Sequence, residues 1–349
     1  MPWYAYLLAP AAFLFHGITA ARNFLFDRGL IRSQKSPIPT LVVGNLSVGG
    51  TGKTPWVEFL VRKLRDEVML GTLSRGYGRN TKGFIQLLPS STAAEVGDEP
   101  LQLYTQFKEE VPVFVGEDRV GATQKIQQLR PDLQLLILDD AFQHRKLNPD
   151  FRIVLTPYSS PFSQDYLLPM GRLRESRAGA KRADVVVVTK CPADLSQEGK
   201  NKLAEELAPY LNSEADLFFS SLNYGSPYHV AGPKQTEFTE VIALAGLADN
   251  APFFAYCKQQ YTLIDSFSFP DHYAYRAEDA TRILEVLGQE KAKNAVLLTT
   301  EKDAVKLKSL AATEMWSKIS IFALPIQVVL DPIQEAKLHQ RLRKNLLHP

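Results

Sequence analysis

Cysteine is nearly absent from this chain: only Cys191 and Cys257 occur among 349 residues. The two lie far apart and show no CxxC or CxxH spacing, which excludes a disulfide framework and a cysteine-based zinc site. Such a sequence favours a reducing, cytosolic compartment. We expect both thiols to be buried as small apolar side chains.

A strong excess of charge of one sign is also missing, since 40 basic and 38 acidic residues leave a net charge of +2. No run of Lys or Arg interleaved with aromatic residues suggests a nucleic-acid groove, so we expect no nucleic-acid partner. With 45% hydrophobic and 22% charged residues, the composition is that of a globular protein. The length allows about two domains.

The most informative segment is residues 40–55, TLVVGNLSVGGTGKTP, in which an apolar strand runs into a glycine-rich loop. Glycines let such a loop turn tightly and point its backbone N–H groups inward, while the helix that follows directs its positive end to the same place. This pattern predicts a site for nucleotide phosphates. The predicted nucleotide-binding residues are Ser47, Val48, Gly49, Gly50, Thr51, Gly52, Lys53 and Thr54.

Two side chains of this loop have distinct expected roles. Lys53 would reach the β- and γ-phosphates, and the Thr54 hydroxyl would hold Mg²⁺. Ser47 stands where the usual pattern has its first glycine. A loop of this kind indicates nucleotide binding, but it does not distinguish a kinase from a switch or a motor.

A second buried strand is expected over residues 133–140, LQLLILDD, which ends in Asp139 and Asp140. Carboxylates at the tip of a central parallel strand lie beside the phosphate loop, where one of them positions Mg²⁺. Further strands are expected at 40–43, 68–74, 111–116, 151–156 and 184–190, and helices at 56–66, 101–109 and 119–129. The pattern predicts a P-loop NTPase-like, three-layer α/β/α domain.

The strand at 184–190 ends in Thr189-Lys190, which is similar to the base-reading loop of GTPases. The aspartate that would bind guanine two residues after the lysine is missing, because Pro192 stands there. Its absence favours ATP over GTP. A P-loop GTPase switch or metallochaperone-type NTPase is the alternative, and a membrane-associated ATPase without an acceptor is a further one.

A shift of composition to Gly, Pro, Ser and Tyr at residues 223–239 predicts a domain boundary. We therefore expect an ATP-binding α/β domain over 36–225 and a second, smaller α/β domain over 226–349 that closes the active-site cleft. In the second domain we expect strands at 241–244, 262–267, 295–300 and 319–324, helices at 252–260 and 278–287, a closing helix at 332–347, and loops at 269–275 and 299–307.

Residues 1–35 are distinct, because the stretch from Trp3 to Phe26 is almost wholly apolar or small. No basic residue precedes this stretch and no clean cleavage site ends it, which disfavours a secretory signal. Polar and helix-breaking residues inside it are costly deep in hydrocarbon, so an apolar anchor helix on the membrane surface is favoured over a spanning helix or a helix docked on the core. The basic residues that would meet anionic headgroups on the cytoplasmic face are Arg22, Arg28, Arg32 and Lys35.

Seven motifs follow one another behind the apolar N-terminus: GNLSVGGTGKTP, SRGYGR, GDEP, LDDAFQH, LPMGRLRE, FPDH and TTEKDAVKL. This combination closely resembles the tetraacyldisaccharide 4′-kinase family, the lipid A 4′-kinases of Gram-negative bacteria, over nearly the whole chain. Ser47 in the place of the first glycine matches that family. Ala141 departs from it, since the family more often has glycine at this position.

The resemblance implies transfer of the γ-phosphate of ATP to the 4′-hydroxyl of a tetraacylated glucosamine disaccharide 1-phosphate, with Mg²⁺ as cofactor. It also implies two α/β/α domains with the active site in the cleft between them. A substrate with four acyl chains stays in the bilayer, so the enzyme has to work at the interface. Its expected partners are this lipid and the cytoplasmic face of the inner membrane.

The resemblance also implies roles for individual residues. Asp98 of GDEP and His272 of FPDH would work as a pair, in which His272 orients Asp98 and raises its basicity as the domains close. Without the family, Asp98 could equally cap the helix near Leu101, and His272 could be a surface residue in a turn. The expected catalytic residues are Lys53, Asp98, Asp140, Arg174, Glu175 and His272, and the expected metal-binding residues are Thr54, Glu99 and Asp139.

Overall fold

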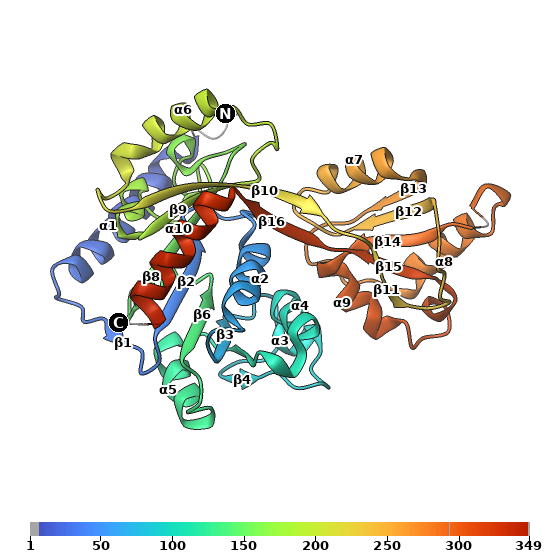
Figure 1. The fold of residues 1–349 in the computed structure, drawn as a ribbon, viewed down its shortest axis with the longest axis horizontal. Coiled ribbons are helices and arrows are strands. Elements are labelled where there is room, and N and C mark those ends of the chain that lie inside the picture. The colour runs from blue at the N-terminus through green and yellow to red at the C-terminus, as the bar shows by residue number, and fades with distance from the viewer. Residues whose placement is uncertain (1–6, 293, 348–349) are drawn as a thin grey trace.

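The computed structural model describes residues 7–292 and 294–347. Within them the chain forms two units, each built on a sheet of its own (Figure 1). The strands of the first unit are β2 (Thr40–Asn45), β3 (Leu70–Ser74), β4 (Ile85–Gln86), β5 (Val113–Val115), β6 (Leu135–Asp139), β8 (Phe151–Pro157), β9 (Val185–Thr189), β10 (Asp216–Tyr224) and β16 (Ile326–Leu330). A separate two-stranded sheet pairs β1 (Gln34–Lys35) with β7 (Leu147–Asn148).

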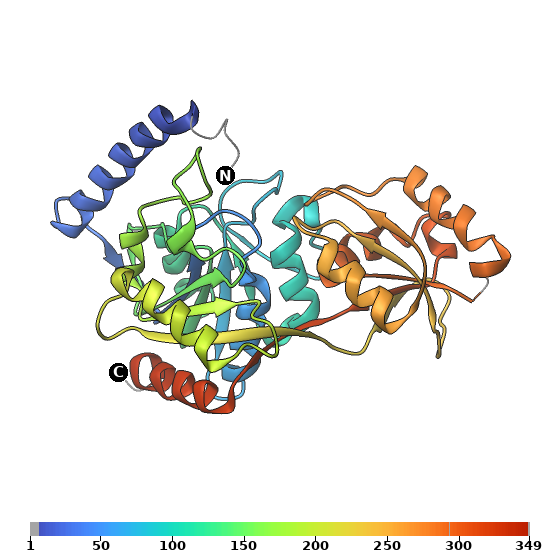
Figure 2. The same ribbon diagram turned by 90° about the horizontal axis from the view of Figure 1, so that it is seen from above.

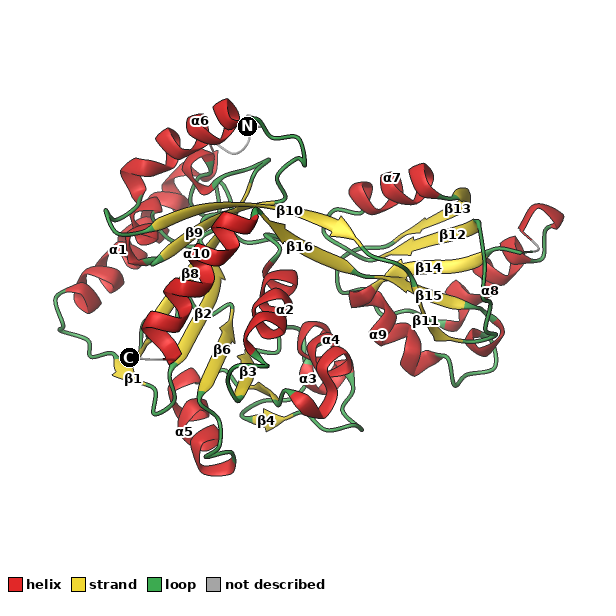
Figure 3. Ribbon diagram, in the orientation of Figure 1, coloured by secondary structure: helices red, strands yellow, loops and turns green. Residues whose placement is uncertain are grey.

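The nine described strands of the first sheet have the order β16-β10-β9-β8-β2-β6-β3-β5-β4. Neighbours run parallel except at the two edges, where β16 and β4 are antiparallel to the strands beside them. Helices cover both faces of this sheet, which gives three layers (Figure 3). The helices of the first unit are α1 (Ala9–Asp27), α2 (Lys53–Leu64), α3 (Ala93–Val96), α4 (Asp98–Phe107), α5 (Arg119–Leu129), α6 (Gln197–Leu207) and α10 (Pro332–Leu342).

The central strand β2 shows why an apolar run becomes a buried strand here. Leu41 and Val43 belong to the core under α2, whereas Val42 belongs to the core on the opposite face. A strand that is buried on both faces has to be apolar at every position. Because β2 and β6 pair in parallel with Val43 opposite Asp139, the aspartates at the end of β6 lie beside the loop that follows β2.

The second unit is a five-stranded sheet of order β11-β15-β14-β12-β13, parallel except for β11. Buried side chains of α8 and α9 pack on one face and those of α7 on the other. The elements are β11 (Tyr228–Ala231), β12 (Glu240–Ala245), β13 (Thr262–Ser268), β14 (Val296–Thr300), β15 (Ile321–Leu324), α7 (Ala251–Gln260), α8 (Ala277–Leu287) and α9 (Glu301–Leu310). The α/β class with parallel sheets is thus confirmed.

The C-terminal part of the chain differs from its prediction. We expected residues 226–349 to form the second domain, but β16 returns to the first sheet, where it pairs with β10, and α10 packs on the first unit (Figure 1). Leu338 and Leu342 of α10 lie in the same core as the side chains of α2. The helical period of 332–347 predicts an apolar face, but it carries no information on which sheet that face covers.

Other expected boundaries also change. The segment 299–307 was expected to be a loop, but residues from Glu301 onward form α9. The helix expected at 101–109 begins earlier, at Asp98, whereas α2 begins at Lys53, directly after the phosphate loop, as expected. The sequence patterns did not predict α6, β10, β11 or β16. Cys191 and Cys257 are free and buried, as expected.

Helix α1 lies along the outside of the first unit (Figure 2). Near its C-terminal end, Asn23 donates a hydrogen bond to Glu175 at 2.9 Å, and Asp27 pairs with Arg145 at 2.7 Å. Its large exposed apolar side chains are Phe13, Leu14, Ile18 and Phe24. Among the described residues, no helix combines the length and apolarity needed to cross a bilayer. Residues 3–6 of the expected anchor lie outside the described part of the chain.

The position of α10 can be tested by Leu338→Ala. Leu338 is 2% exposed in the core shared with α2, so we expect the free energy of unfolding to fall by about 2–5 kcal/mol. The matched control is Ile333→Ala on the same helix, where the side chain is 80% exposed and the effect should stay within roughly 0.5 kcal/mol. Hydrogen exchange should accelerate in α2; acceleration confined to α7 and α8 would contradict the assignment.

Candidate active site

The loop between β2 and α2 has the backbone shape of a phosphate cradle. Gly49 and Gly52 adopt φ values of +107° and +86°, which side chains other than glycine rarely tolerate. The amide of Asn45 donates hydrogen bonds to the Ser47 carbonyl at 2.6 Å and to the Thr51 hydroxyl at 2.9 Å. Helix α2 begins directly after this loop, so the positive end of the helix faces the cradle.

A second segment, residues 165–174, fixes this loop from outside. The Val48 amide donates to the Arg172 carbonyl at 2.8 Å, and the Arg174 amide donates to the Leu46 carbonyl at 2.8 Å. These two backbone bonds run along one side of the loop. They bring the Arg174 side chain to the edge of the phosphate site.

Asp140 holds two positive charges beside the loop. The Lys53 Nζ lies 3.7 Å from its Oδ1, and the Arg174 Nη1 lies 2.8 and 3.0 Å from its two oxygens. Burial alone would raise the pKa of Asp140, but the charges on Lys53 and Arg174 outweigh burial and hold the pKa below its ordinary value. The structure therefore brings together three of the predicted site residues, with Asp140 ionised between two cations.

Asp139 is buried and lacks a hydrogen-bond donor for its Oδ1. Burial and the negative charge of Glu99 raise the pKa of Asp139 well above its ordinary value. A buried carboxylate oxygen without a donor suits a hard cation such as Mg²⁺. Within residues 7–292 and 294–347, no three His, Cys, Asp or Glu side chains gather as a metal cluster. Mg²⁺ in phosphate chemistry typically uses one or two carboxylates and the substrate phosphates, and Asp139 with Thr54 at the start of α2 fits that donor set.

Asp98 and His272 come from different units and meet at their boundary. The His272 Nδ1 lies 3.1 Å from the Asp98 Oδ2. Asp98 is the first residue of α4, and Gly97 occupies the cap position, so the alternative that Asp98 caps this helix is wrong. His272 has a φ of +59°, a conformation that is strained for histidine and persists only where its surroundings fix it.

The environment of Asp98 keeps it ionised. Its burial would raise the pKa, but the hydrogen bond from His272 and the charge of Lys306 hold the pKa of Asp98 below its ordinary value. Glu99, the next residue of α4, acts electrostatically on Asp139. Because Asp98 and Glu99 are adjacent at the start of α4, the Asp98–His272 pair lies beside a residue expected at the metal site.

Comparison with known proteins gives the family. The family model described as tetraacyldisaccharide-1-P 4′-kinase matches residues 4–347. The chain belongs to this family. The tetraacyldisaccharide 4′-kinase of Flavobacterium psychrophilum is 42% identical over 325 residues, which cover 92% of this chain and 91% of the relative. That of Bacteroides thetaiotaomicron is 37% identical over 96% of this chain and 91% of its own length.

A solved structure agrees with this family. The crystal structure of LpxK from Aquifex aeolicus in complex with ATP covers 97% of this chain and 99% of its own, with a TM-score of 0.75 and 30% sequence identity. The family decides between the alternatives that the sequence left open. The chain is a kinase, and neither the GTPase switch nor the acceptor-free ATPase is needed.

Glu175 requires a correction, because it was expected in the cleft as a catalytic residue. Its side chain is 0% exposed, and protein groups occupy both oxygens. Oε1 accepts hydrogen bonds from Arg182 at 2.7 Å and Gln143 at 3.1 Å, and Oε2 accepts one from Asn23 at 2.9 Å. Glu175 is thus a positioning residue: it holds Gln143, whose Oε1 lies 3.4 Å from the Arg174 guanidinium.

Two lysines of the kinase site escaped the sequence analysis. Lys302 Nζ lies 3.3 Å from the His272 Nε2 and 2.7 Å from Asp271, and Lys306 Nζ lies 3.5 Å from the Asp98 Oδ2. An ammonium group can only donate, so the His272 Nε2 accepts from Lys302 and its Nδ1 carries the proton that points to Asp98. Lys302 therefore selects the tautomer of the pair.

A signal for these lysines was present in the sequence. Thr300 and Asp303 have the spacing of a helix start, and the Thr300 hydroxyl accepts a hydrogen bond from the Asp303 amide. A helix that begins there places Lys302 and Lys306, four residues apart, on one face. Because residues 299–307 are expected above to form a loop, the sequence analysis does not place the two lysines on a common helix face.

We expect Lys302→Met to lower kcat roughly 10- to 100-fold, the range found when a hydrogen bond that orients a functional histidine is lost. The KM for ATP should change less than kcat, because Lys302 lies 3.3 Å from His272 and reaches the expected metal site only through Glu99, at 4.0 Å. Lys308→Met, on the exposed side of the same helix, is the matched control. Steady-state kinetics of the two variants decide the question: equal kcat values would exclude a role for Lys302 in positioning His272.

Proposed function

We propose that this chain transfers the γ-phosphate of ATP to the 4′-hydroxyl of tetraacyldisaccharide 1-phosphate, with Asp98 and His272 acting on the acceptor. The reaction is that of the family to which the chain belongs. The observation that supports the residue roles most directly is the 3.1 Å contact between the Asp98 of one unit and the His272 of the other. Glu99, which follows Asp98 on α4 and is an expected metal-site residue, supports an acceptor site between this pair and the phosphate loop.

The phosphate side of the site supplies positioning and positive charge. Loop N–H groups and Lys53 would hold the β- and γ-phosphates, and Arg174, which also contacts Asp140, would add a second cation. Thr54 and Asp139, with Glu99 nearby, would hold Mg²⁺. When bound there, Mg²⁺ neutralises charge on the β- and γ-phosphates.

The acceptor side supplies a proton acceptor. Asp98 is ionised, and among the described residues its contacts to His272 and to Lys306 are both made through Oδ2. Its Oδ1 is therefore left to face a sugar hydroxyl. As the oxygen of that hydroxyl bonds to phosphorus, the proton passes to Asp98 and ADP leaves with the β-phosphate oxygen. His272 keeps the carboxylate oriented during this transfer.

We also propose that α1 holds the enzyme on the cytoplasmic face of the inner membrane. Four large apolar side chains of α1 are exposed, and a contiguous apolar helix surface of this kind inserts into the headgroup region of a bilayer. Arg22, Arg28, Arg32 and Lys35 lie on or just after this helix and would attract anionic lipids. An enzyme held there would reach an acceptor whose four acyl chains lie in the same bilayer.

If the proposed reaction is correct, ADP formation requires both the lipid acceptor and Lys53. Lys53→Ala should lower kcat by at least about 100-fold, because it removes a cation that stabilises the transferred phosphate. Lys202→Ala on the surface of α6 is the control and should be unaffected. ADP release is measured with and without lipid disaccharide 1-phosphate. ADP formation that does not depend on the acceptor, or a clear preference for GTP, would contradict the assignment.

The membrane role of α1 is tested by Phe13→Asp combined with Ile18→Asp. Both side chains are exposed, at 76% and 62%, so the fold should tolerate the change while binding to vesicles falls. Co-sedimentation with vesicles that contain phosphatidylglycerol gives the bound fraction. Thr281→Asp together with Gln289→Asp, at exposed positions on and just after α8, adds the same two carboxylates far from α1 and serves as the control. An unchanged bound fraction in the α1 variant would locate the anchor elsewhere.

A further inference from the structure

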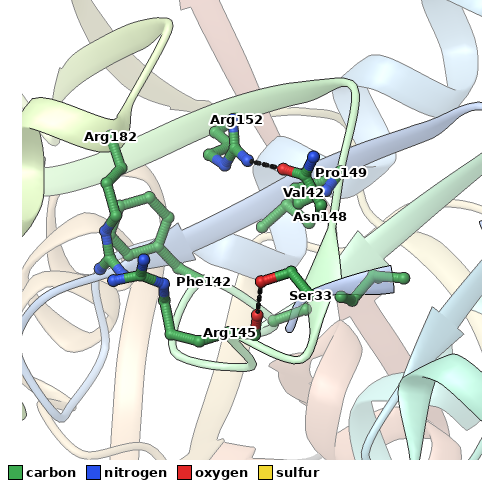
Figure 4. Close-up of a pocket in the computed structure, with 10 residues that line it drawn as sticks. Ser33, Val42, Phe142, Arg145, Asn148, Pro149, Arg152 and Arg182 are labelled. Atoms are coloured by element: carbon green, nitrogen blue, oxygen red, sulfur yellow. Dashed lines mark hydrogen bonds between the residues drawn. The ribbon is translucent and has the colours of Figure 1, made fainter. Parts of the chain in front are cut away.

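A cavity of about 190 Å³, whose lining residues are drawn in Figure 4, lies among residues packed on the face of the first sheet opposite α2. Its Arg145 contacts Asp27 at the C-terminal end of α1. Three arginines from separate segments line the cavity together with the ring of Phe142: Arg145, Arg152 and Arg182. Among the described residues no Asp or Glu side chain belongs to its lining. The lining of this arginine cavity therefore presents three guanidinium groups, and none of them takes part in the phosphate transfer proposed above.

The acidic partners of these arginines lie outside the cavity lining. Arg145 pairs with Asp27 at 2.7 Å, and Arg182 pairs with Glu175 at 2.7 Å. Each of these pairs occupies only part of a guanidinium group, which has five N–H donors. The Nη1 of Arg182 is buried without a hydrogen-bond partner. A donor of this kind is costly to bury unless a ligand satisfies it.

Arg152 completes the cluster from β8. Its Nη2 donates to the Asn148 side chain at 2.6 Å, which is a neutral partner (Figure 4). Burial lowers the pKa of Arg152, and the charge of Arg145 lowers it further, although the Asp184 carboxylate opposes this. Burial likewise lowers the pKa of Arg182, against the attraction of Glu175. Repulsion among these three partly buried guanidinium groups would be relieved by an anion between them.

We propose that the arginine cavity binds a phosphate group. Guanidinium groups bind phosphate oxygens in pairs of parallel hydrogen bonds, and three of them offer more donors than a single phosphate needs. The volume suffices, because a water molecule takes roughly 30 Å³ and a phosphate has five heavy atoms. The side chains of Ser33 and Asn148, which also line the cavity, add polar partners at its rim.

The position of the cavity points to a phosphate carried by a lipid. It adjoins the C-terminal end of α1, where Asp27 contacts Arg145 and the Arg145 guanidinium lies 5.2 Å from the centre of the Phe26 ring. If α1 lies on the bilayer, as proposed above, the cavity opens near the headgroup layer. The phosphate is then that of the acceptor, at its 1-position, or that of a bilayer phospholipid. This choice of source rests on the proposed function, whereas the binding of phosphate does not.

The direct test is a calorimetric titration of the full chain with inorganic phosphate. Saturating Mg²⁺ and a nonhydrolysable ATP analogue fill the phosphate loop beforehand, so that only a second site remains. We expect saturable binding that Arg152→Gln weakens at least about tenfold, the loss that corresponds to 1.4 kcal/mol. Arg130→Gln, a surface arginine that pairs with Asp132, is the matched control and should bind like the unaltered protein.

A second variant guards against a simple loss of structure. Asp27→Asn removes the ion pair with Arg145 but leaves the guanidinium in the cavity, so phosphate affinity should be kept or increased. Thermal unfolding of each variant establishes that it is folded. The absence of saturable phosphate binding in the unaltered protein, or equal affinity in Arg152→Gln, would overturn the proposal.

Two further arms distinguish the sources of the phosphate. In micelles of an uncharged detergent, a rise in the KM for the acceptor in Arg152→Gln identifies the acceptor 1-phosphate as the ligand. An unchanged KM together with weaker binding to phosphatidylglycerol vesicles identifies a bilayer phospholipid. If phosphate binds but neither readout changes, the lipid assignment is wrong and the site takes free phosphate. If the unaltered protein does not phosphorylate the acceptor, the proposed kinase function is refuted. The phosphate-site proposal is unaffected by that result, because it is tested by the separate phosphate titration.

Discussion

The hydrogen bond between Asp98 and His272 is the constraint on which the arrangement of this enzyme depends. It joins a helix of the first unit to a loop of the second across 174 positions of sequence. The chain passes between the two sheets through the antiparallel pair of β10 and β16, so the relative position of the units is set by that pair and by the contacts at their boundary. A hydrogen bond to an ionised group contributes about 1.5–3 kcal/mol, which here stabilises the contact between the two units.

The loop that forms the phosphate site is held in place by contacts within the first unit. The loop is fixed by the Asn45 side chain and by backbone bonds from residues 165–174, and Asp140 holds Lys53 and Arg174 in place. Behind this layer, Glu175 binds groups from three parts of the chain, including Asn23 of α1. The helix that we place on the membrane is thus connected by side chains to the site of phosphate transfer. Glu175 therefore forms a direct structural link between α1 and the residues around the phosphate site.

Much of this was predictable from the sequence because local rules decide it. The loop around Gly52 needs positive φ, the run that ends in Asp139 needs burial on both faces, and parallel pairing then puts the two at one edge. The meeting of Asp98 and His272 was not derivable from spacing, and only the family resemblance predicted it. The predictions that failed concern packing between distant segments. The apolar face of α10 could be predicted from the sequence, but not which of the two units it packs on. Arg174 and Glu175 are adjacent in sequence, yet Arg174 contacts Asp140 at the phosphate site and Glu175 is fully buried behind it.

The central claim is that Asp98 and His272 act as one unit on the acceptor hydroxyl. A double-mutant cycle measures this most directly, with kcat determined at saturating ATP and acceptor for Asp98→Ala, His272→Ala and the double variant. Residues that act as a unit give non-additive losses, so the double variant should be no slower than the slower single variant, within about threefold. Losses that multiply in the double variant would show that the two residues act independently and would contradict this account.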